Sequence, residues 1–330
     1  MHADHIMGLI TFLRNVLYPP MTPAKLSNHP PSVEIYGPAG LRLFIRSNLK
    51  LTFTKTSERY VVHELLTQSD EITPCSPPNI LHSSECAGRD VACDDSGFWI
   101  EFASKKGRFG NVVVDAGPIL HRDPCIGYII RESVQPYRKL VILGDTYDPS
   151  AIAPLAMSPP PSLLVHEATD AFIPRSVDPK SNRSRETVQQ KVLAHGHSTS
   201  VMAGEFAKQI GAQMLVLNHI GTRFSAPYIP PRKNDIRVAI IKEIERQATE
   251  AWGMGRAQAA VDYKRIIVPP SNQSAASMEP SLQTDAREAN EINSQMGHAT
   301  ADQKGVIDDQ RRRKKRKMSH DVPVISTENN

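Results

Sequence analysis

The chain has 330 residues, 40 % of them hydrophobic and 22 % charged, a composition typical of a globular protein long enough to bury a sizeable core. No apolar run approaches the roughly 18 residues that a bilayer span needs, and the N-terminus lacks a secretory pattern, so we expect neither a membrane protein nor a secreted one. The net charge of +4 includes seven positive charges in one run near the C-terminus, so it does not by itself predict a nucleic-acid-binding body. The four cysteines have no CxxC spacing and predict reduced thiols in an intracellular compartment.

The first half of the chain predicts helices and short strands in mixed order. Apolar residues recur at helical spacing from residue 6 to residue 17, and a strand is expected at residues 33–36. A short amphipathic helix should follow through Leu43, Phe44 and Leu49. Residues 69–96 are rich in Ser, Pro, Cys and Asp and predict a polar surface insertion, after which strands are expected at residues 98–102 and 111–114.

The second half alternates more regularly between strands and helices. Continuous apolar runs at residues 140–143, 163–165 and 214–217 predict strands buried on both faces. A helix ending at Gly211 is expected before the last of these strands, a second helix at residues 234–248, and a final strand at residues 266–268. This alternation predicts an α/β layered domain.

The composition changes after Pro270. Residues 271–330 contain no aromatic residue and are rich in Ser, Gln, Asn, Asp and Lys, so they predict a disordered tail. The tail carries a basic run that predicts a nuclear-localisation signal or non-specific nucleic-acid contacts, with a solvated charge cluster as the alternative. We therefore expect a nuclear protein, with a cytoplasmic fraction as a further expectation. The run consists of Arg311, Arg312, Arg313, Lys314, Lys315, Arg316 and Lys317.

Histidines and acidic residues follow several of the predicted strands. Because the carboxyl ends of strands meet at one edge of an open α/β sheet, these side chains can converge there. Imidazole and carboxylate groups together are suitable ligands for Zn²⁺. Each residue alone has a simpler explanation as a hydrogen-bonded polar group, a turn or a helix cap, so the hypothesis rests on the ordered set. The set comprises His2, Asp4, His5, His121, Asp145, His166, Glu167 and His219.

The motifs around these residues resemble those of tRNase Z, the tRNA 3′-end processing endoribonucleases of the metallo-β-lactamase superfamily. HADH at residues 2–5 resembles the end of HxHxDH, and HRDPCIGY at residues 121–128 resembles the third metal motif. GDT at residues 144–146 resembles the bridging-aspartate motif, and NHIGTRF at residues 218–224 resembles the terminal histidine motif. HEAT at residues 166–169 and GHST at residues 196–199 resemble the two motifs that set tRNase Z apart, and the short form is the closer match.

The resemblance covers roughly residues 1–270 and implies a metallo-β-lactamase-like αββα sandwich. The first histidine of HxHxDH and the strands that precede it in the family are absent, so we expect an N-terminally incomplete domain, from a fragment, a misplaced start codon or a truncated paralogue. Two domains follow as an expectation: the tRNase Z domain at residues 1–270, with its polar insertion near residues 69–96, and the tail at residues 271–330.

The resemblance also implies two bound zinc ions, with Mn²⁺ as an alternative. The two ions would share Asp145: His2, His121 and the absent first histidine of HxHxDH would be the other protein ligands of one, and Asp4, His5 and His219 those of the other. Three further residues have implied roles around the metals. Asp4 would also accept a proton from the attacking water, and His197, oriented by Glu167, would be the general acid. Ser198 and Thr199 would contact a phosphate, with a plain helix-cap role as the alternative.

The implied activity is removal of 3′ trailers from precursor tRNA, which is the expected partner; a homodimer is a further expectation. The stretch between Tyr128 and Gly144 is too short for the tRNA-gripping arm that many short forms carry. Other basic loops, at residues 105–108 and 175–185, are therefore the candidate RNA contacts, with ordinary solvated charge as the alternative. Two different functions remain open: a truncated non-catalytic paralogue that acts as a binding or dimer partner, and a metallohydrolase for another phosphodiester.

Overall fold

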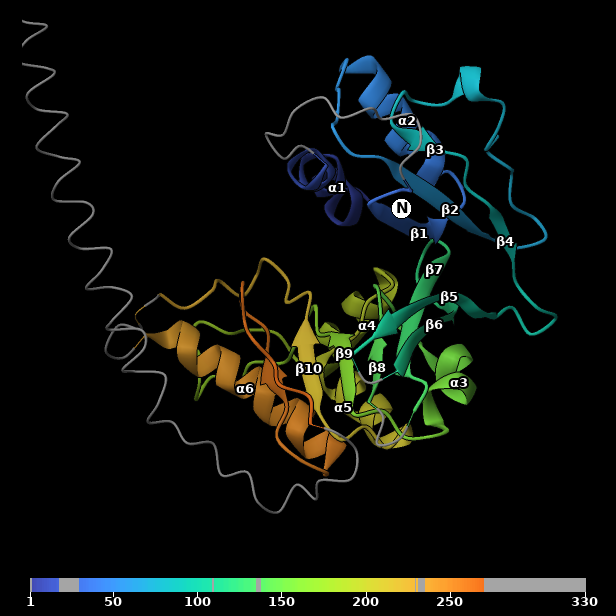
Figure 1. Ribbon diagram of the computed structural model, residues 1–330. Coiled ribbons are helices and arrows are strands. Elements are labelled where there is room, and N and C mark those ends of the chain that lie inside the picture. Colours follow the sequence, from blue (N-terminus) through green and yellow to red (C-terminus); the bar gives the residue numbers. More distant parts are fainter. Residues whose placement is uncertain are drawn as a thin grey trace, which may run out of the picture. The chain divides into compact units, whose positions relative to one another are not determined.

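The computed structural model describes residues 2–17, 30–108, 110–134, 138–228, 230 and 235–269, and these described residues form one compact unit (Figure 1). The predicted tail and its basic run lie outside the described residues. Within the described part, no helix is long and apolar enough to cross a membrane.

The first sheet is parallel and is built around β2 (Tyr60–Leu66). β1 (Val33–Pro38) pairs with one edge of β2, and β3 (Glu85–Cys86) and β4 (Asp90–Ala92) pair with the other. Both short strands, and the 3₁₀ turn Pro78–Ile80, come from the segment expected to be a surface insertion. That segment therefore supplies part of the sheet. Its strands have two or three residues, too few to show a period of two.

Helices α1 (Ala3–Val16) and α2 (Leu41–Leu51) cover one face of this sheet. The helix predicted at residues 6–17 is therefore confirmed, and the second predicted helix exists with a different buried face. Leu43, expected inside, is 55 % exposed, whereas Ile45 and Leu49 are buried. Arg42 and Arg46 also lie on the buried face of α2, where they pair with Glu64 and Glu85 of the sheet. The buried face therefore includes charged residues, and the spacing of the apolar residues alone does not predict it.

The second sheet has seven strands in the order β11-β10-β9-β8-β7-β6-β5. Strands β5 to β8 pair antiparallel, and β8 to β11 pair parallel. The strands are β5 (Trp99–Gly107), β6 (Gly110–Ile119), β7 (Cys125–Glu132), β8 (Lys139–Ile142), β9 (Leu163–Glu167), β10 (Leu215–Asn218) and β11 (Gln258–Ala259).

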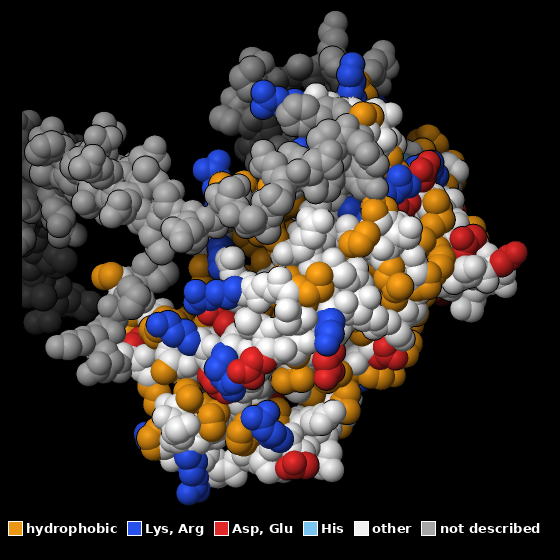
Figure 2. All heavy atoms as spheres, turned by 90° about the horizontal axis from the view of Figure 1, so that it is seen from below, with side chains coloured by type: hydrophobic (Ala, Val, Ile, Leu, Met, Phe, Trp, Pro, Cys, Tyr) orange, Lys and Arg blue, Asp and Glu red, His pale blue; other side chains and the backbone are white. Residues whose placement is uncertain are grey.

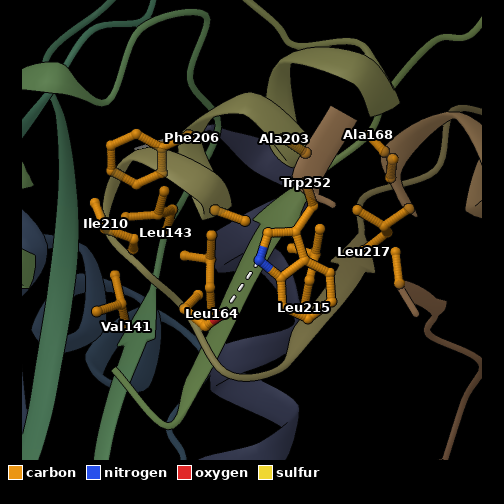
Figure 3. Close-up of a cluster of buried hydrophobic side chains, with 14 of the residues drawn as sticks. Val141, Leu143, Leu164, Ala168, Ala203, Phe206, Ile210, Leu215, Leu217 and Trp252 are labelled. Carbon is orange, nitrogen blue, oxygen red and sulfur yellow. Dashed lines mark hydrogen bonds between the residues drawn. The ribbon is translucent and has the colours of Figure 1, made fainter. Parts of the chain in front are cut away.

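The helices of the second half pack against this sheet. α5 (Ser200–Gln209) contacts β9 and β10, and α6 (Ile236–Trp252) packs on α5 (Figure 1). The main cluster of buried side chains lies between them, where the Trp252 ring nitrogen donates to the Ala212 carbonyl at 3.2 Å (Figure 3). The remaining helices are the 3₁₀ turn Ser150–Ile152, α3 (Ala153–Met157) and α4 (Arg185–Ala194).

The two sheets pack face to face through Leu65, Trp99, Phe102 and Ala116. The described chain therefore has helix, sheet, sheet and helix layers, as the sequence predicted. The final strand predicted at residues 266–268 is wrong: these residues are irregular and Ile267 is 70 % exposed. β11 lies earlier, at Gln258–Ala259, and completes the parallel edge beside β10.

Candidate metal centre

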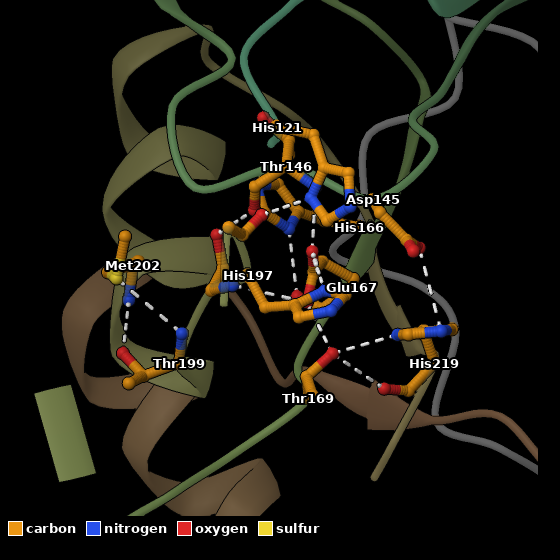
Figure 4. Close-up of polar contacts among 12 residues, drawn as sticks. His121, Asp145, Thr146, His166, Glu167, Thr169, His197, Thr199, Met202 and His219 are labelled. Carbon is orange, nitrogen blue, oxygen red and sulfur yellow. Dashed lines mark hydrogen bonds and ion pairs between the residues drawn. The ribbon is translucent and has the colours of Figure 1, made fainter. Parts of the chain in front are cut away.

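The acidic and imidazole side chains predicted from the sequence meet at one edge of the second sheet (Figure 4). Strands β6, β8, β9 and β10 all run in the same direction, since β7 is antiparallel to both of its neighbours. Their carboxyl ends therefore lead into His121, Asp145, Glu167 and His219, respectively. The first turn of α1 adds its own residues to the same place.

One group of four residues brings four ligand atoms within 4.8 Å of one another: Asp4, His5, Asp145 and His219. The His5 Nε2 atom lies 3.1 Å from Asp145 Oδ1 and 3.6 Å from Asp4 Oδ2. The His219 Nε2 atom lies 3.4 Å from Asp4 Oδ2 and 3.6 Å from Asp145 Oδ1. Ligands at about 2.0–2.2 Å from a tetrahedral zinc ion are about 3.3–3.6 Å apart, so this group fits zinc.

A second group of three ligand atoms comes from His2, His121 and Asp145. The His121 Nδ1–H donates to the Gly196 carbonyl at 2.6 Å, which leaves a lone pair on Nε2. That Nε2 atom is buried and has no hydrogen-bond partner among the described residues, as a metal-ligand nitrogen without its metal should be. His2 contacts Asp123 at 2.7 Å, the kind of carboxylate contact that orients ligand imidazoles.

The Asp145 carboxylate belongs to both groups and is buried, so this one side chain could contribute to both. Asp4, by contrast, is exposed. Burial acts to raise the pKa of Asp4, but the hydrogen bonds with His219 and with its own main chain, together with the nearby charges of His5 and His219, outweigh it and hold the pKa of the carboxyl below its usual range. The hydrogen bond from His2 likewise lowers the pKa of Asp123. Both exposed carboxyls are therefore ionised at neutral pH.

A buried carboxylate, Glu167, lies directly behind these groups. It accepts hydrogen bonds from the Thr146 main-chain N–H at 2.6 Å and the Ser198 main-chain N–H at 3.1 Å. The Thr169 hydroxyl donates to it at 2.5 Å, and the His197 Nδ1–H at 3.0 Å. Burial acts to raise the pKa of Glu167, but these hydrogen bonds outweigh it and hold the pKa below its usual range. The bond to Glu167 raises the pKa of His197 in turn.

The His197 ring lies between two of the proposed ligands. Its centroid is 4.9 Å from that of His121 and 5.2 Å from that of His219. Its Nδ1 is held by Glu167, so Nε2 is the ring nitrogen that remains for a proton transfer. Glu167 and His197 therefore form a hydrogen-bonded acid–base pair beside the candidate metal ligands.

Ser198 and Thr199, the two predicted phosphate contacts, lie beneath this dyad. Ser198 is fully buried and its hydroxyl donates to the Thr146 carbonyl at 2.6 Å. The Thr199 side chain caps α5 and accepts the Met202 main-chain N–H at 3.3 Å. Both side chains thus have hydrogen-bond partners within the fold. Thr199 has the helix-cap role that was the alternative to a phosphate contact.

His166 points to the other side of β9 from Glu167. It is fully buried, and its Nδ1–H donates to the Glu167 carbonyl at 2.8 Å. Its ring lies 5.9 Å from that of Phe206 in the helix-packed core. Although it ends a strand as the other residues do, His166 is not among the candidate metal ligands.

Residues that no single-position argument singled out support the site. Thr146 and Thr169 bind Glu167, and Gly196 provides the carbonyl that orients His121. Gly196 has a φ of +78°, and a Cβ added there would lie 2.6 Å from His121 Nδ1. His219 itself has a φ of +48°, in the left-handed region that few side chains adopt. The motifs contain these residues, but their partners are set only by tertiary structure.

A cavity of roughly 430 Å³ adjoins the ligand groups. His2, His5, His121 and Asp145 line it together with an apolar wall from β1, α1 and β7 that includes Tyr36. The metal-type groups therefore border open space that a substrate can enter.

The basic residues proposed as RNA contacts have mixed environments. Lys105 is exposed and pairs with Glu34 at 2.5 Å. Arg183 is held by Asp170 through two hydrogen bonds, at 2.5 and 2.8 Å, and the Arg185 guanidinium lies over the Phe172 ring. On the face that Figure 2 shows, Lys and Arg side chains alternate with Asp and Glu. Several of the basic side chains proposed to bind RNA are thus already paired with carboxylates or an aromatic ring of the same chain.

The chain matches no protein-family model. It is similar to ribonuclease Z from Streptococcus sanguinis, with 29 % identity over 74 % of this chain and 78 % of the relative. It is also similar to human zinc phosphodiesterase ELAC protein 1, with 25 % identity over 82 % of each chain. The solved structure of human tRNase Z, short form, superposes with a TM-score of 0.52 and 28 % identity, covering 82 % of this chain and 76 % of that one. The predicted resemblance and the predicted metallo-β-lactamase-like α/β fold are both confirmed.

Proposed function

We propose that this chain, a homologue of the ribonuclease Z proteins, is a metal-dependent endoribonuclease. Its substrate would be precursor tRNA, from which it would remove the 3′ trailer. The observation that carries the proposal is the pairing of two ligand groups around Asp145 with the Glu167–His197 dyad. The ligand groups alone fit many metallohydrolases, whereas the dyad comes from the HEAT and GHST motifs that resemble tRNase Z.

Zinc fits the ligand sets, with Mn²⁺ as an alternative. Asp4, His5, Asp145 and His219 would hold one ion, and His2, His121 and Asp145 would hold the other. Two such ions supply a water of lowered pKa and bind the oxygens of a phosphodiester. The Nε2 atoms of His121 and His166 are both buried without a partner among the described residues, but only His121 lies with other candidate ligands, His2 and Asp145, and this supports its assignment.

The residues of the chain would move two protons. The Asp4 carboxylate, exposed at the mouth of the site, would accept the proton of the attacking water. The 3′-oxygen that leaves the tRNA body is a poor leaving group and needs a proton, which His197 would donate from Nε2. Glu167 keeps the His197 ring oriented and raises its pKa, so a larger share of the ring is protonated at neutral pH than in a free histidine. The products are a tRNA with a 3′-hydroxyl and a 5′-phosphorylated trailer.

The RNA would reach this centre across the open cavity beside it. Strands β7 and β8 are joined by residues 133–138 alone, so a long arm cannot start there, and exposed lysines such as Lys106 are the remaining candidates on the β5–β6 hairpin. Basic side chains would bind the phosphate backbone without reading its sequence. Homodimerisation remains a prediction.

The test is cleavage of a labelled precursor tRNA by the zinc-loaded protein. We expect a single cut at the 3′ end of the tRNA body, lost on adding a chelator and restored by zinc or manganese. The matched control is His197→Ala. This variant should bind the same precursor but cleave it much more slowly than the wild type does. A folded, metal-loaded protein that leaves the precursor intact would refute the assignment.

The two alternatives predict different outcomes of the same assay. A non-catalytic binding or dimer partner would retain the precursor in a gel-shift assay and cut neither it nor a generic phosphodiester. A metallohydrolase for another phosphodiester would hydrolyse bis(p-nitrophenyl) phosphate but not the precursor. Each outcome would replace the proposal above.

We also propose that the basic run at residues 311–317, which lies outside the described residues, directs the protein to the nucleus. Its composition alone supports this. Residues 271–330 fused to a fluorescent reporter should accumulate in nuclei, and the version with the seven basic residues replaced by Ala should not. Equal distribution of the two reporters would refute nuclear targeting, and salt-dependent RNA binding would then be tested for the run.

A further inference from the structure

Thr169 joins two parts of the site that are separate in sequence. Its hydroxyl oxygen lies 2.5 Å from Glu167 Oε2 and 2.8 Å from His219 Nδ1 (Figure 4). Glu167 is the partner of His197, and His219 is a proposed metal ligand. One hydroxyl therefore connects the ligand group with the dyad.

The chemistry of the three groups fixes the direction of these hydrogen bonds. The Thr169 hydroxyl faces two groups that can only accept, the Glu167 carboxylate at 2.5 Å and the His219 main-chain carbonyl at 3.1 Å, so its single proton goes to one of them, and Glu167 is the nearer. The hydroxyl oxygen must then accept the Nδ1–H of His219. This tautomer leaves Nε2 of His219 with a free lone pair, and Nε2 is the atom that lies within 3.6 Å of both Asp4 and Asp145. The hydroxyl thus selects the tautomer that a metal requires.

The backbone around Thr169 holds this geometry in place. The Gly221 N–H donates to the Thr169 carbonyl at 3.1 Å, and a Cβ at Gly221 would lie 2.5 Å from that carbonyl oxygen. Between these contacts His219 is held at a φ of +48°. The loop after β9, which contains Thr169, is therefore packed closely against the loop after β10, which contains His219 and Gly221.

We infer that Thr169 is a positioning residue that selects the metal-binding tautomer of His219 and ties its orientation to the carboxylate that orients His197. The inference rests on metal binding in the proposed function, and it does not depend on the substrate. Groups that orient ligand imidazoles typically account for about 10- to 100-fold in metal affinity. Loss of the Thr169 hydroxyl should weaken zinc binding at the group with Asp4, His5, Asp145 and His219 by a similar factor.

The test compares Thr169→Val, which has the same shape without the hydroxyl, with Thr169→Ser, which keeps the hydroxyl. Zinc affinity of the metal-stripped protein is measured by competition with a chromogenic chelator. Thermal unfolding checks that each variant folds. We expect the valine variant to bind one zinc ion about 10- to 100-fold more weakly, and the serine variant to stay within a few-fold of the wild type.

The outcomes separate this inference from the proposed function. Wild-type affinity in a folded Thr169→Val would overturn the inference, and so would equal loss in the valine and serine variants, because serine keeps the hydroxyl. If the wild-type protein binds no zinc, the metal centre of the proposed function fails, and the role of Thr169 fails with it. If the wild type binds zinc but cuts no precursor, only the proposed substrate fails.

Discussion

The ring of His121 is oriented by the main-chain carbonyl of Gly196, which lies 2.6 Å from His121 Nδ1. The two residues are 75 positions apart, one after β6 and one in the loop before α5. The glycine of GHST therefore does more than permit a turn: it brings a carbonyl oxygen against a proposed ligand, and its missing side chain leaves room for the ring.

Gly196→Ala should weaken zinc binding at the His2, His121 and Asp145 group. An alanine Cβ would lie 2.6 Å from His121 Nδ1 and 2.8 Å from the Arg122 main-chain nitrogen, and the φ of +78° adds backbone strain. The His121 ring must shift, so we expect about one zinc ion per chain to be lost or bound at least 10-fold more weakly. Elemental analysis after dialysis measures this. Gly211→Ala, also at positive φ but far from the ligands, is the matched control and should retain the metal.

His197→Ala and Asp145→Ala should separate chemistry from metal binding. His197 belongs to neither group around Asp145, and in its own cluster with Glu167 and His219 its Nδ1 is already held by Glu167. Its loss should therefore slow precursor cleavage by about 100- to 10,000-fold with unchanged zinc content. Asp145 is common to both groups, so its loss should remove zinc and activity together. Zinc lost from the first variant, or kept by the second, would mean that the two roles are assigned wrongly.

Lys139 should make the stability of the fold depend on pH. Its buried amine donates to the carbonyls of Leu155 and Ala156 at 2.5 and 2.9 Å, and burial lowers its pKa from 10.5 to about 8. Between pH 8 and pH 10 the unfolded chain therefore binds more protons at this residue than the folded chain, and the free energy of unfolding should rise with pH.

Urea unfolding of the wild type and Lys139→Met at several pH values between 7 and 10 isolates this effect. The wild type should gain stability relative to the variant as the pH rises through this window. A difference between the two proteins that stays constant with pH would contradict the linkage.

The sequence predicted the helix and sheet layers and the order of the ligand residues, because buried parallel strands have continuous apolar runs that end in polar residues. It missed β2, where the buried Glu64 interrupts the apolar pattern of Tyr60–Leu66. That carboxylate is compensated by the buried Arg42, 3.3 Å away and 22 positions earlier. Such a pair is visible only once the helix and the strand are packed.

The hydrogen bonds that support the site could not be predicted from the sequence either, because their partners are far apart in the chain and meet only on folding. The spacing of HEAT does not show that the Thr169 hydroxyl reaches His219, 50 positions later. Nor does GHST show that Ser198 is buried rather than open to a phosphate. Residue type was enough to propose the ligand residues, whereas their hydrogen-bond partners depend on loops that meet only in the folded chain.

The central claim, that this edge of the sheet is a zinc centre, is tested most directly by anomalous diffraction from crystals grown with zinc. Data collected just above and below the zinc absorption edge would place each ion independently of the atomic model. A zinc ion at this centre should give a peak about 2.0–2.2 Å from Asp4 Oδ2, His5 Nε2, Asp145 Oδ1 and His219 Nε2. A crystal that holds zinc elsewhere and shows no anomalous peak among these four atoms would contradict it.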